Sequence, residues 1–205
     1  MKSYKPRQFD LSGLNGISDE TLEMHFELYE GYVTNTNELN EKIAQLVTSR
    51  SGVSDKTVFS ELKRRLGFEY NGMVLHEYYF ENLRRNGGGE AEKGTEFRNA
   101  VDAAFGSWEV WKADFTAVGM MRGIGWAICF EDHVGQPVNV WVDEHQTNDI
   151  AGFRPLLVMD VWEHAYLLDY KPGEKSKYIE SFFSNIDWQR VEKRAQAARG
   201  ELVAR

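Results

Sequence analysis

Mainly apolar side chains in the first third of the chain recur at three- and four-residue steps, the spacing of one face of an α-helix. This face comprises Leu22, His25, Phe26, Tyr29, Tyr32 and Val33. Ser18 precedes it as the expected N-cap, and Asp19 and Glu20 follow where the helix dipole favours negative charge. The pattern therefore predicts one long helix over residues 17–47.

A second helical pattern follows the polar segment 48–55 and extends from about Lys56 to Leu83. We expect this helix to be interrupted near Gly67 and Gly72, because glycine lowers the stability of a helix interior. Two long helices joined by a short connector predict an antiparallel helical hairpin.

Three consecutive glycines at residues 87–89 end the helical pattern, since such a run cannot hold regular structure cheaply. We place a domain boundary at this point. The expected organisation is an N-terminal helical hairpin domain over residues 1–86 and a C-terminal α+β domain over residues 87–205.

The second domain mixes helical and strand patterns. Two helices are expected within residues 91–105 and 107–120, and two β-prone runs flanking DHVGQP (132–137) predict a hairpin. The segment FRPLLVMD (153–160) predicts a third strand. Further helices are expected over residues 161–170, 174–184 and 187–203. Together these elements predict an α+β fold with a small three-stranded antiparallel sheet in the C-terminal lobe.

Charge and cysteine content exclude several classes of function. A net charge of -8 argues against a nucleic-acid binder, which usually carries a basic stripe. No run of about 18 apolar residues predicts a membrane span, and the first residues lack the apolar stretch of a secretory signal. Cys129 is the only cysteine, which excludes an internal disulfide and a cysteine-based zinc site. We expect a reducing, cytoplasmic location.

A polar cluster directly follows the apolar end of the third expected strand. Leu-Leu-Val-Met (156–159) is succeeded by Asp160, Glu163 and His164. Buried charges are costly unless they are paired or bound to metal. Either the cluster lies in water just beyond the strand, or another group holds it inside.

Histidines supply a candidate for that group. A lone histidine on an apolar helix face is usually structural, but His25 and His76 both lie on inward faces of the two hairpin helices. Two facing imidazoles are explained by a shared metal ion. Asp160 and His164 converge either on one helix or from a strand end and a first helical turn, and a metal-free hydrogen-bonded pair is the alternative. Three imidazoles and one carboxylate suit iron, manganese or zinc.

With these residues assembled, the chain resembles the iron/manganese superoxide dismutase family over nearly its whole length. The segment DVWEHAY (160–166) is close to the best-known signature of that family. Other similar segments are YVTNTNEL (32–39), FGSWEVWKADF (105–115), GIGWAICF (123–130) and YIESFFSNIDW (178–188).

The resemblance implies a mononuclear metal site. Its ligands would be His25, His76, Asp160 and His164, which hold one iron or manganese ion per subunit together with a solvent molecule. It further implies that Trp126 and Trp162 wall the metal. In the implied homodimer, Glu163 reaches across the interface to His164 of the partner subunit and orients that imidazole.

The residue that hydrogen-bonds the metal's solvent departs from the family pattern. The family usually has a glutamine there, whereas the two matching positions of this chain hold Gly72 and His145. We assign the role to His145. Its neighbours Asp143, Glu144 and Gln146 stay as alternatives.

The gateway tyrosine also departs from the pattern. In the family it lies eight residues after the first ligand, whereas Tyr32 lies seven after His25. Seven residues are close to two helical turns, so Tyr32 still returns to the His25 face. The bulge that the family spacing needs is expected to be absent here, and Tyr29 is the alternative gateway.

Two further family features are altered. A histidine and its cross-interface tyrosine partner are replaced by Tyr29 and Leu167, and losing both partners leaves neither unpaired. The arginine that steers substrate in the family corresponds to Lys175, which keeps the charge without the bidentate fork.

The implied activity is dismutation of superoxide to dioxygen and hydrogen peroxide by alternate reduction and oxidation of the metal. Iron and manganese share this ligand set, so the sequence leaves the metal open, as it leaves dimer versus tetramer. The alternatives are another redox or oxygen enzyme on the same metal scaffold and a structural paralogue that has lost catalysis. No nucleic-acid or membrane partner is expected.

Overall fold

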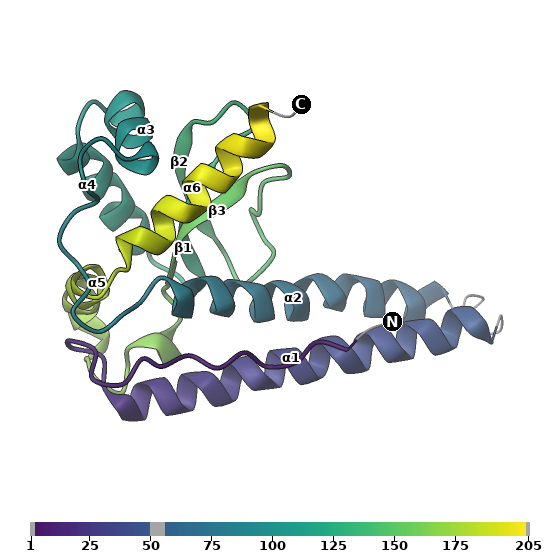
Figure 1. Cartoon of the computed structure of the whole chain (residues 1–205). Helices are drawn as coiled ribbons and strands as arrows, with labels where there is room; N and C mark the ends of the chain where they lie inside the picture. Colours follow the sequence, from purple (N-terminus) through teal and green to yellow (C-terminus); the bar gives the residue numbers. More distant parts are fainter. Residues whose placement is uncertain (1–2, 50–55, 204–205) are drawn as a thin grey trace.

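Two long antiparallel helices form the N-terminal part of the molecule. The computed structural model describes residues 3–49 and 56–203, with side chains described to residue 198 of the last helix. Helix α1 (Asp19–Thr48) and helix α2 (Lys56–Glu81) lie side by side (Figure 1). The Ser18 hydroxyl accepts a hydrogen bond from the Thr21 N–H, which confirms the predicted N-cap. The predicted connector falls largely outside the described residues.

Helix α2 is continuous, so the interruptions predicted near Gly67 and Gly72 are wrong. Glycine inside a helix costs only about 1 kcal/mol relative to alanine, which packing can offset. At Gly72 the absence of a side chain leaves the space that the Tyr32 ring occupies. A Cβ at this position would lie 2.6 Å from Cδ1 of Tyr32, which is closer than real contacts allow.

The C-terminal lobe is a three-stranded antiparallel sheet with helices packed around it. Helices α3 (Glu96–Phe105) and α4 (Trp108–Gly119) precede strands β1 (Trp126–Glu131), β2 (Pro137–Val142) and β3 (Arg154–Asp160). The strand order is β2-β1-β3, and β1 is buried along its whole length. The predicted fold class and the three strands are confirmed.

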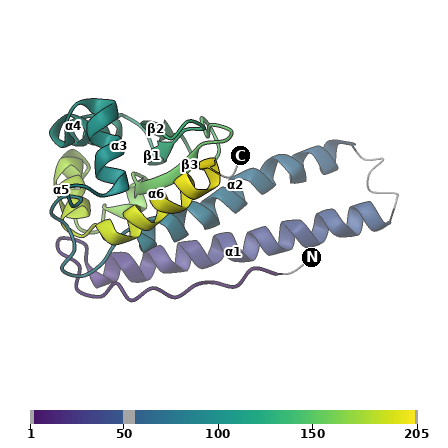
Figure 2. The same ribbon diagram turned by 45° about the horizontal axis from the view of Figure 1, so that its top comes forward.

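The sheet register brings one end of each of the three strands together at the same end of the sheet. Trp126, the first residue of β1, pairs with Val142 at the end of β2 and with Asp160 at the end of β3. Helix α2 packs against β3. The end of β3 therefore meets the hairpin, and the second lobe covers the half of the hairpin that contains the start of α1 and the end of α2 (Figure 2).

The segment 161–170, predicted to be helical, contains only a short 3-10 helix, η1 (Glu163–Ala165). The Val161 N–H still donates to the Gly125 carbonyl, and the Trp162 N–H donates to Oδ1 of Asp160 at 2.8 Å. The first bond extends the pairing of β3 with the chain before β1, and the second closes a local turn on the Asp160 side chain, so no regular helix begins at residue 161. The 3-10 helix η2 (Pro172–Glu174) leads into the predicted helices α5 (Lys175–Ser184) and α6 (Trp188–Val203).

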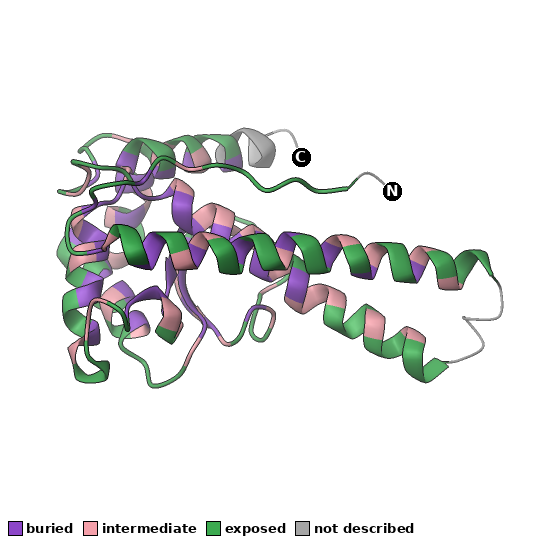
Figure 3. Ribbon diagram, turned by 90° about the horizontal axis from the view of Figure 1, so that it is seen from below, coloured by how far each residue is buried: buried purple, intermediate pink, exposed green. Residues whose placement is uncertain are grey.

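Burial is concentrated where the hairpin meets the second lobe. The buried residues of α2 all lie between Glu69 and Phe80, and Figure 3 shows mostly exposed and intermediate positions in the rest of that helix. Residues 3–16 form an irregular, largely extended segment that runs along the hairpin (Figure 2). No helix in the described ranges is both long and apolar enough to span a membrane.

Candidate metal centre

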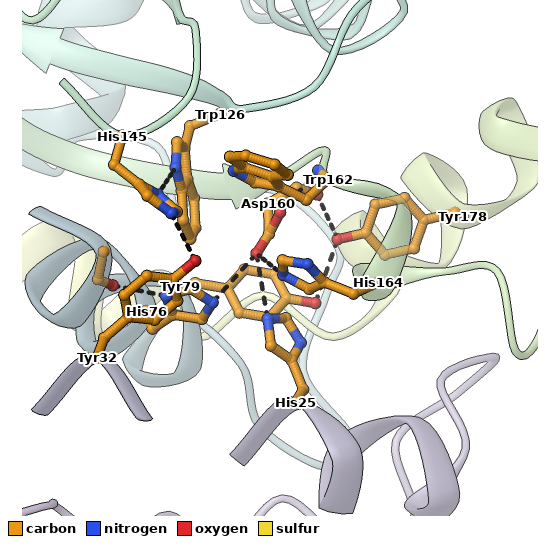
Figure 4. Close-up of polar contacts among 11 residues, drawn as sticks. His25, Tyr32, His76, Tyr79, Trp126, His145, Asp160, Trp162, His164 and Tyr178 are labelled. Atoms are coloured by element: carbon orange, nitrogen blue, oxygen red, sulfur yellow. Dashed lines mark hydrogen bonds and ion pairs between the residues drawn. The ribbon is translucent and has the colours of Figure 1, made fainter. Parts of the chain in front are cut away.

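Four residues from separate elements converge at the junction of the two lobes. His25 comes from α1, His76 from α2, Asp160 from the end of β3 and His164 from η1 (Figure 4). One potential ligand atom from each lies within 4.8 Å of all the others. The three Nε2 atoms surround Oδ2 of Asp160 at 3.1, 3.6 and 3.2 Å, in the order His25, His76 and His164.

Of the two arrangements predicted for Asp160 and His164, the structure contains the one with a strand end and a helical turn. Asp160 ends a strand and His164 lies in a short 3-10 turn, so the two side chains converge without sharing a regular helix. The wholly apolar run before Asp160 is buried strand, and Asp160 itself is fully buried. The cluster therefore lies inside the protein and not in water beyond the strand.

The hydrogen bonds of His76 indicate that a cation fits this centre. Its Nδ1 contacts the Gly72 carbonyl oxygen at 2.5 Å, so Nδ1 carries the proton and Nε2 presents a lone pair. That lone pair faces a carboxylate oxygen of Asp160 at 3.6 Å, and Nε2 is buried without a hydrogen-bond partner. Two facing acceptors repel each other unless a positive ion lies between them. The metal-free pair considered from the sequence does not account for this contact.

Burial also favours the protonation states that a metal requires. It lowers the pKa of His25 and holds the pKa of His76 well below its usual value, so both imidazoles stay neutral. For Asp160 burial acts in the opposite direction, but the nearby His164 and His25 outweigh it and leave the pKa of this carboxyl below its usual range. Neutral imidazoles and an ionised carboxylate are the ligand forms that bind a divalent or trivalent ion.

His145 and Tyr32 form a second polar contact beside the four residues. His145 is fully buried, and its Nδ1 accepts a hydrogen bond from the Trp126 indole N–H at 3.0 Å. Its Nε2 must then carry the proton, which it donates to the Tyr32 hydroxyl at 2.8 Å. Burial lowers the pKa of His145 to about 4 and raises the pKa of Tyr32 to about 12, so both groups are neutral at pH 7.

The predicted alternatives to these two residues lie elsewhere. The Tyr29 hydroxyl accepts from the Arg7 N–H at 2.9 Å and donates to Glu77 at 2.9 Å. The Gln146 amide donates to Glu144 at 3.1 Å. Tyr32 is therefore the tyrosine that lies beside the four residues, and His145 is the loop residue whose side chain contacts it. Helix α1 contains no bulge, as its spacing predicts.

The tryptophans predicted to wall the centre do lie against it. The Trp126 ring meets the His76 ring edge-on, with ring centroids 5.0 Å apart. Trp162 stacks on His145 and on His164, with centroid distances of 5.0 and 5.9 Å. These rings therefore pack against the imidazoles on the side of the second lobe.

Three other residues named from the sequence lie outside this cluster. Glu163 and Leu167 are exposed on η1 and the turn after it. Lys175 is largely buried, and its Nζ donates to the Met121 carbonyl at 3.3 Å.

Sequence reasoning missed two buried tyrosines behind Asp160. The Tyr178 hydroxyl donates to the main-chain carbonyl of Asp160 at 2.7 Å and lies 3.2 Å from the Tyr79 hydroxyl. The Tyr178 hydroxyl is the donor toward both the Asp160 carbonyl and the Tyr79 oxygen, and the shorter contact is to the carbonyl. No spacing rule connects α5 with the end of β3, so the sequence carried no signal for this chain of hydrogen bonds.

Comparisons with known proteins agree with this geometry. Residues 8–84 match the family model for the alpha-hairpin domain of iron/manganese superoxide dismutases, and residues 92–194 match the model for their C-terminal domain. The superoxide dismutase [Fe] of Aquifex pyrophilus is 38% identical over 189 residues, covering 90% of this chain and 87% of that protein. The superoxide dismutase [Mn] of Haloarcula marismortui is 34% identical, with 91% and 89% covered. The superoxide dismutase [Mn/Fe] of Aeropyrum pernix is 30% identical, with 89% and 84% covered.

Proposed function

The chain belongs to the iron/manganese superoxide dismutase family, and we propose that it converts superoxide to dioxygen and hydrogen peroxide at the centre described above. Its iron or manganese ion would be held by His25, His76, Asp160 and His164. The observation that carries this assignment is the convergence of three imidazole nitrogens on one buried carboxylate oxygen. A bound ion would supply the one-electron redox chemistry that the dismutation requires.

Protons reach the reacting anion through Tyr32. Because His145 donates Nε2–H to the Tyr32 oxygen, the hydroxyl proton of Tyr32 is directed away from His145. His145 cannot relay a proton through its ring, since its Nδ1 is occupied by the Trp126 N–H. His145 therefore orients Tyr32, and Tyr32 regains its proton from solvent.

Reconstitution tests the proposed activity. The metal-free protein is loaded with iron or with manganese, and superoxide removal is measured for each form alongside the metal content. We expect one ion per chain and activity with at least one metal. Activity with neither metal would contradict the proposal and leave the two alternatives, another oxygen enzyme or an inactive paralogue. His25→Ala and His164→Ala should lose bound metal together with activity.

We also propose a homodimer in which Glu163 of the partner subunit bonds to His164. Glu163 is exposed, and its side chain has no partner among the described residues. His164 is the one proposed ligand with a partly exposed side chain, at 19%. Exposed Leu167 and Leu168 lie beside them. A shared contact of this kind would orient the His164 imidazole.

Glu163→Ala tests the dimer. Removing the carboxylate should weaken association or increase metal loss, because the imidazole of the neighbouring subunit loses its acceptor. Molecular mass by light scattering over a dilution series and metal content after dialysis are the measurements, with Glu180→Ala on the surface of α5 as the matched control. A dimer with unchanged metal retention would show that Glu163 does not cross the interface.

The boundary after residue 86, the cytoplasmic location and a steering role for Lys175 stay predictions. Buried Cys129, whose pKa burial raises to about 12, is consistent with an unreactive thiol and does not distinguish compartments.

A further inference from the structure

A groove between α1 and α2 opens beside Tyr32. It has a volume of about 540 Å³, and Tyr32, Arg65, Phe68 and Glu69 are among its lining residues. The hydroxyl of Tyr32 is hydrogen-bonded to His145. The groove is therefore bordered by the tyrosine that contacts His145 beside the metal centre.

Arg65 is held rigidly in this groove. Its Nε and Nη2 lie 2.8 and 2.6 Å from Oε1 of Glu69, and its guanidinium carbon lies 4.1 Å above the centre of the Phe68 ring. Its side chain is still 45% exposed. Within the described residues Nη1 has no hydrogen-bond partner, so the fixed cation presents a free donor to solvent.

The neighbouring carboxylate does not cancel this charge at the groove surface. The Glu69 side chain is 4% exposed, and its second oxygen accepts from the Asn35 amide at 3.1 Å. Both oxygens are thus engaged below the guanidinium, so the positive end of the ion pair faces the groove. This arrangement is an oriented dipole and not a solvated surface pair.

Arg65 is connected to the gateway through Phe68. The Phe68 ring packs edge-on against His145, with centroids 4.5 Å apart, and lies 6.1 Å from the Tyr32 ring. The charge of Arg65 also reaches Tyr32, where it lowers the pKa, while the Glu69 carboxylate acts more strongly there and adds to the increase in pKa that burial causes. By contrast, the Lys175 ammonium is turned to the Met121 carbonyl and is largely buried.

We propose that Arg65 is the cation that guides superoxide along the α1–α2 groove to Tyr32. The inference rests on the proposed function, because it identifies the entry path of that substrate. A small monovalent anion approaching a chain of net charge -8 needs a local positive potential. The opposing charges that line the groove are Glu69, which is paired with Arg65, and exposed Glu27, which has no hydrogen-bond or ion-pair partner in the described part of the chain.

Charge substitutions on both residues test the proposal. In the metal-loaded enzyme, Arg65→Gln should lower kcat/KM for superoxide about two- to threefold at low ionic strength, as expected for one charge roughly 10 Å away in water. Glu27→Gln should raise it by a similar factor. Both effects should disappear at high salt, where screening removes the field. Stopped-flow measurement of superoxide decay over a salt series, with metal content as a second readout, checks this.

Arg64 provides a matched control. It is adjacent on α2 and forms the same type of bond, with Nε and Nη2 lying 2.8 and 2.6 Å from Glu61, but it does not line the groove. Arg64→Gln changes the net charge equally and should leave kcat/KM within experimental error. Arg65→Lys keeps the charge and should retain most of the rate.

The measurements distinguish a failure of the proposed function from a failure of the guiding role of Arg65. An inactive parent enzyme contradicts the proposed function itself. An active parent with equal rates for the Arg65→Gln and Arg64→Gln variants contradicts the guiding role alone. If Arg65→Lys is as slow as Arg65→Gln, or the loss persists at high salt, Arg65 acts through structure and the proposal fails.

Discussion

The chemistry available to each histidine depends on which ring nitrogen is already engaged. In His76, Nδ1 donates to the Gly72 carbonyl, so Nε2 offers a lone pair to a metal. In His145, Nδ1 accepts from the Trp126 N–H, so Nε2 keeps its proton and acts as a donor. The two rings lie 6.1 Å apart, yet their neighbours assign them opposite roles. Because His76 donates to a carbonyl, its other nitrogen can bind a metal. Because His145 accepts from an indole N–H, its other nitrogen is a donor that orients Tyr32.

Gly72 is the residue on which this arrangement depends most directly. Its carbonyl fixes the tautomer of His76, and its missing side chain admits the Tyr32 ring, whose nearest atom would lie 2.6 Å from a Cβ. Gly72→Ala should therefore destabilise the protein by about 1–3 kcal/mol through overpacking. It should also displace Tyr32 and reduce activity per bound metal. Chemical denaturation and superoxide removal measure the two effects.

Gly67 is the control for that substitution. It lies in the same helix, and a Cβ there would meet no atom within 4 Å. Gly67→Ala should stabilise the protein by about 0.5–1 kcal/mol, because alanine loses less conformational entropy in a helix. Activity should be unchanged. If both alanine variants behave alike, the contact between Gly72 and Tyr32 has no consequence for stability or catalysis.

At the scale of elements, the spacing of apolar residues predicted most of the fold. The buried face of a helix recurs about every 3.6 residues and that of a strand every 2, whatever the element packs against. The prediction failed at two places where tertiary contacts outweigh local preference. Gly67 and Gly72 do not interrupt α2, and residues 161–170 do not form a helix. In residues 161–170, the Val161 N–H is bonded to the Gly125 carbonyl and the Trp162 N–H to the Asp160 side chain. These bonds keep the start of the segment out of a helix. Neither contact is visible in the sequence.

The arrangement of elements also explains why the site was only partly predictable. Residue identities and the family resemblance singled out the four proposed ligands and the pair Tyr32 and His145. Arg65, Tyr79 and Tyr178 were not found, because their roles depend on sheet register and helix packing. Trp126 pairs with both Val142 and Asp160, which brings the ends of β2 and β3 to the same edge. His145 lies three residues after the end of β2, so its side chain reaches the metal centre that contains Asp160.

At the scale of the whole molecule, buried neutral histidines couple folding to pH. Burial lowers the pKa of His145 from 6.5 to about 4, and the pKa values of His25 and His76 shift in the same direction. Between about pH 6.5 and 4 the unfolded chain therefore binds more protons than the folded one. Acidification through this window favours unfolding, whereas above pH 6.5 the stability contribution is fully present.

The metal-free protein should consequently lose stability steadily between pH 6.5 and 4, with His145 alone accounting for roughly 3 kcal/mol. Urea denaturation at intervals across this range measures the slope. His145→Gln removes one titrating group and should flatten the slope. Because bound metal competes with protons for the ligand imidazoles, the metal-loaded protein should resist acid further, until the ion is released. Equal slopes for the parent and the His145→Gln variant would show that this imidazole is not held neutral by burial.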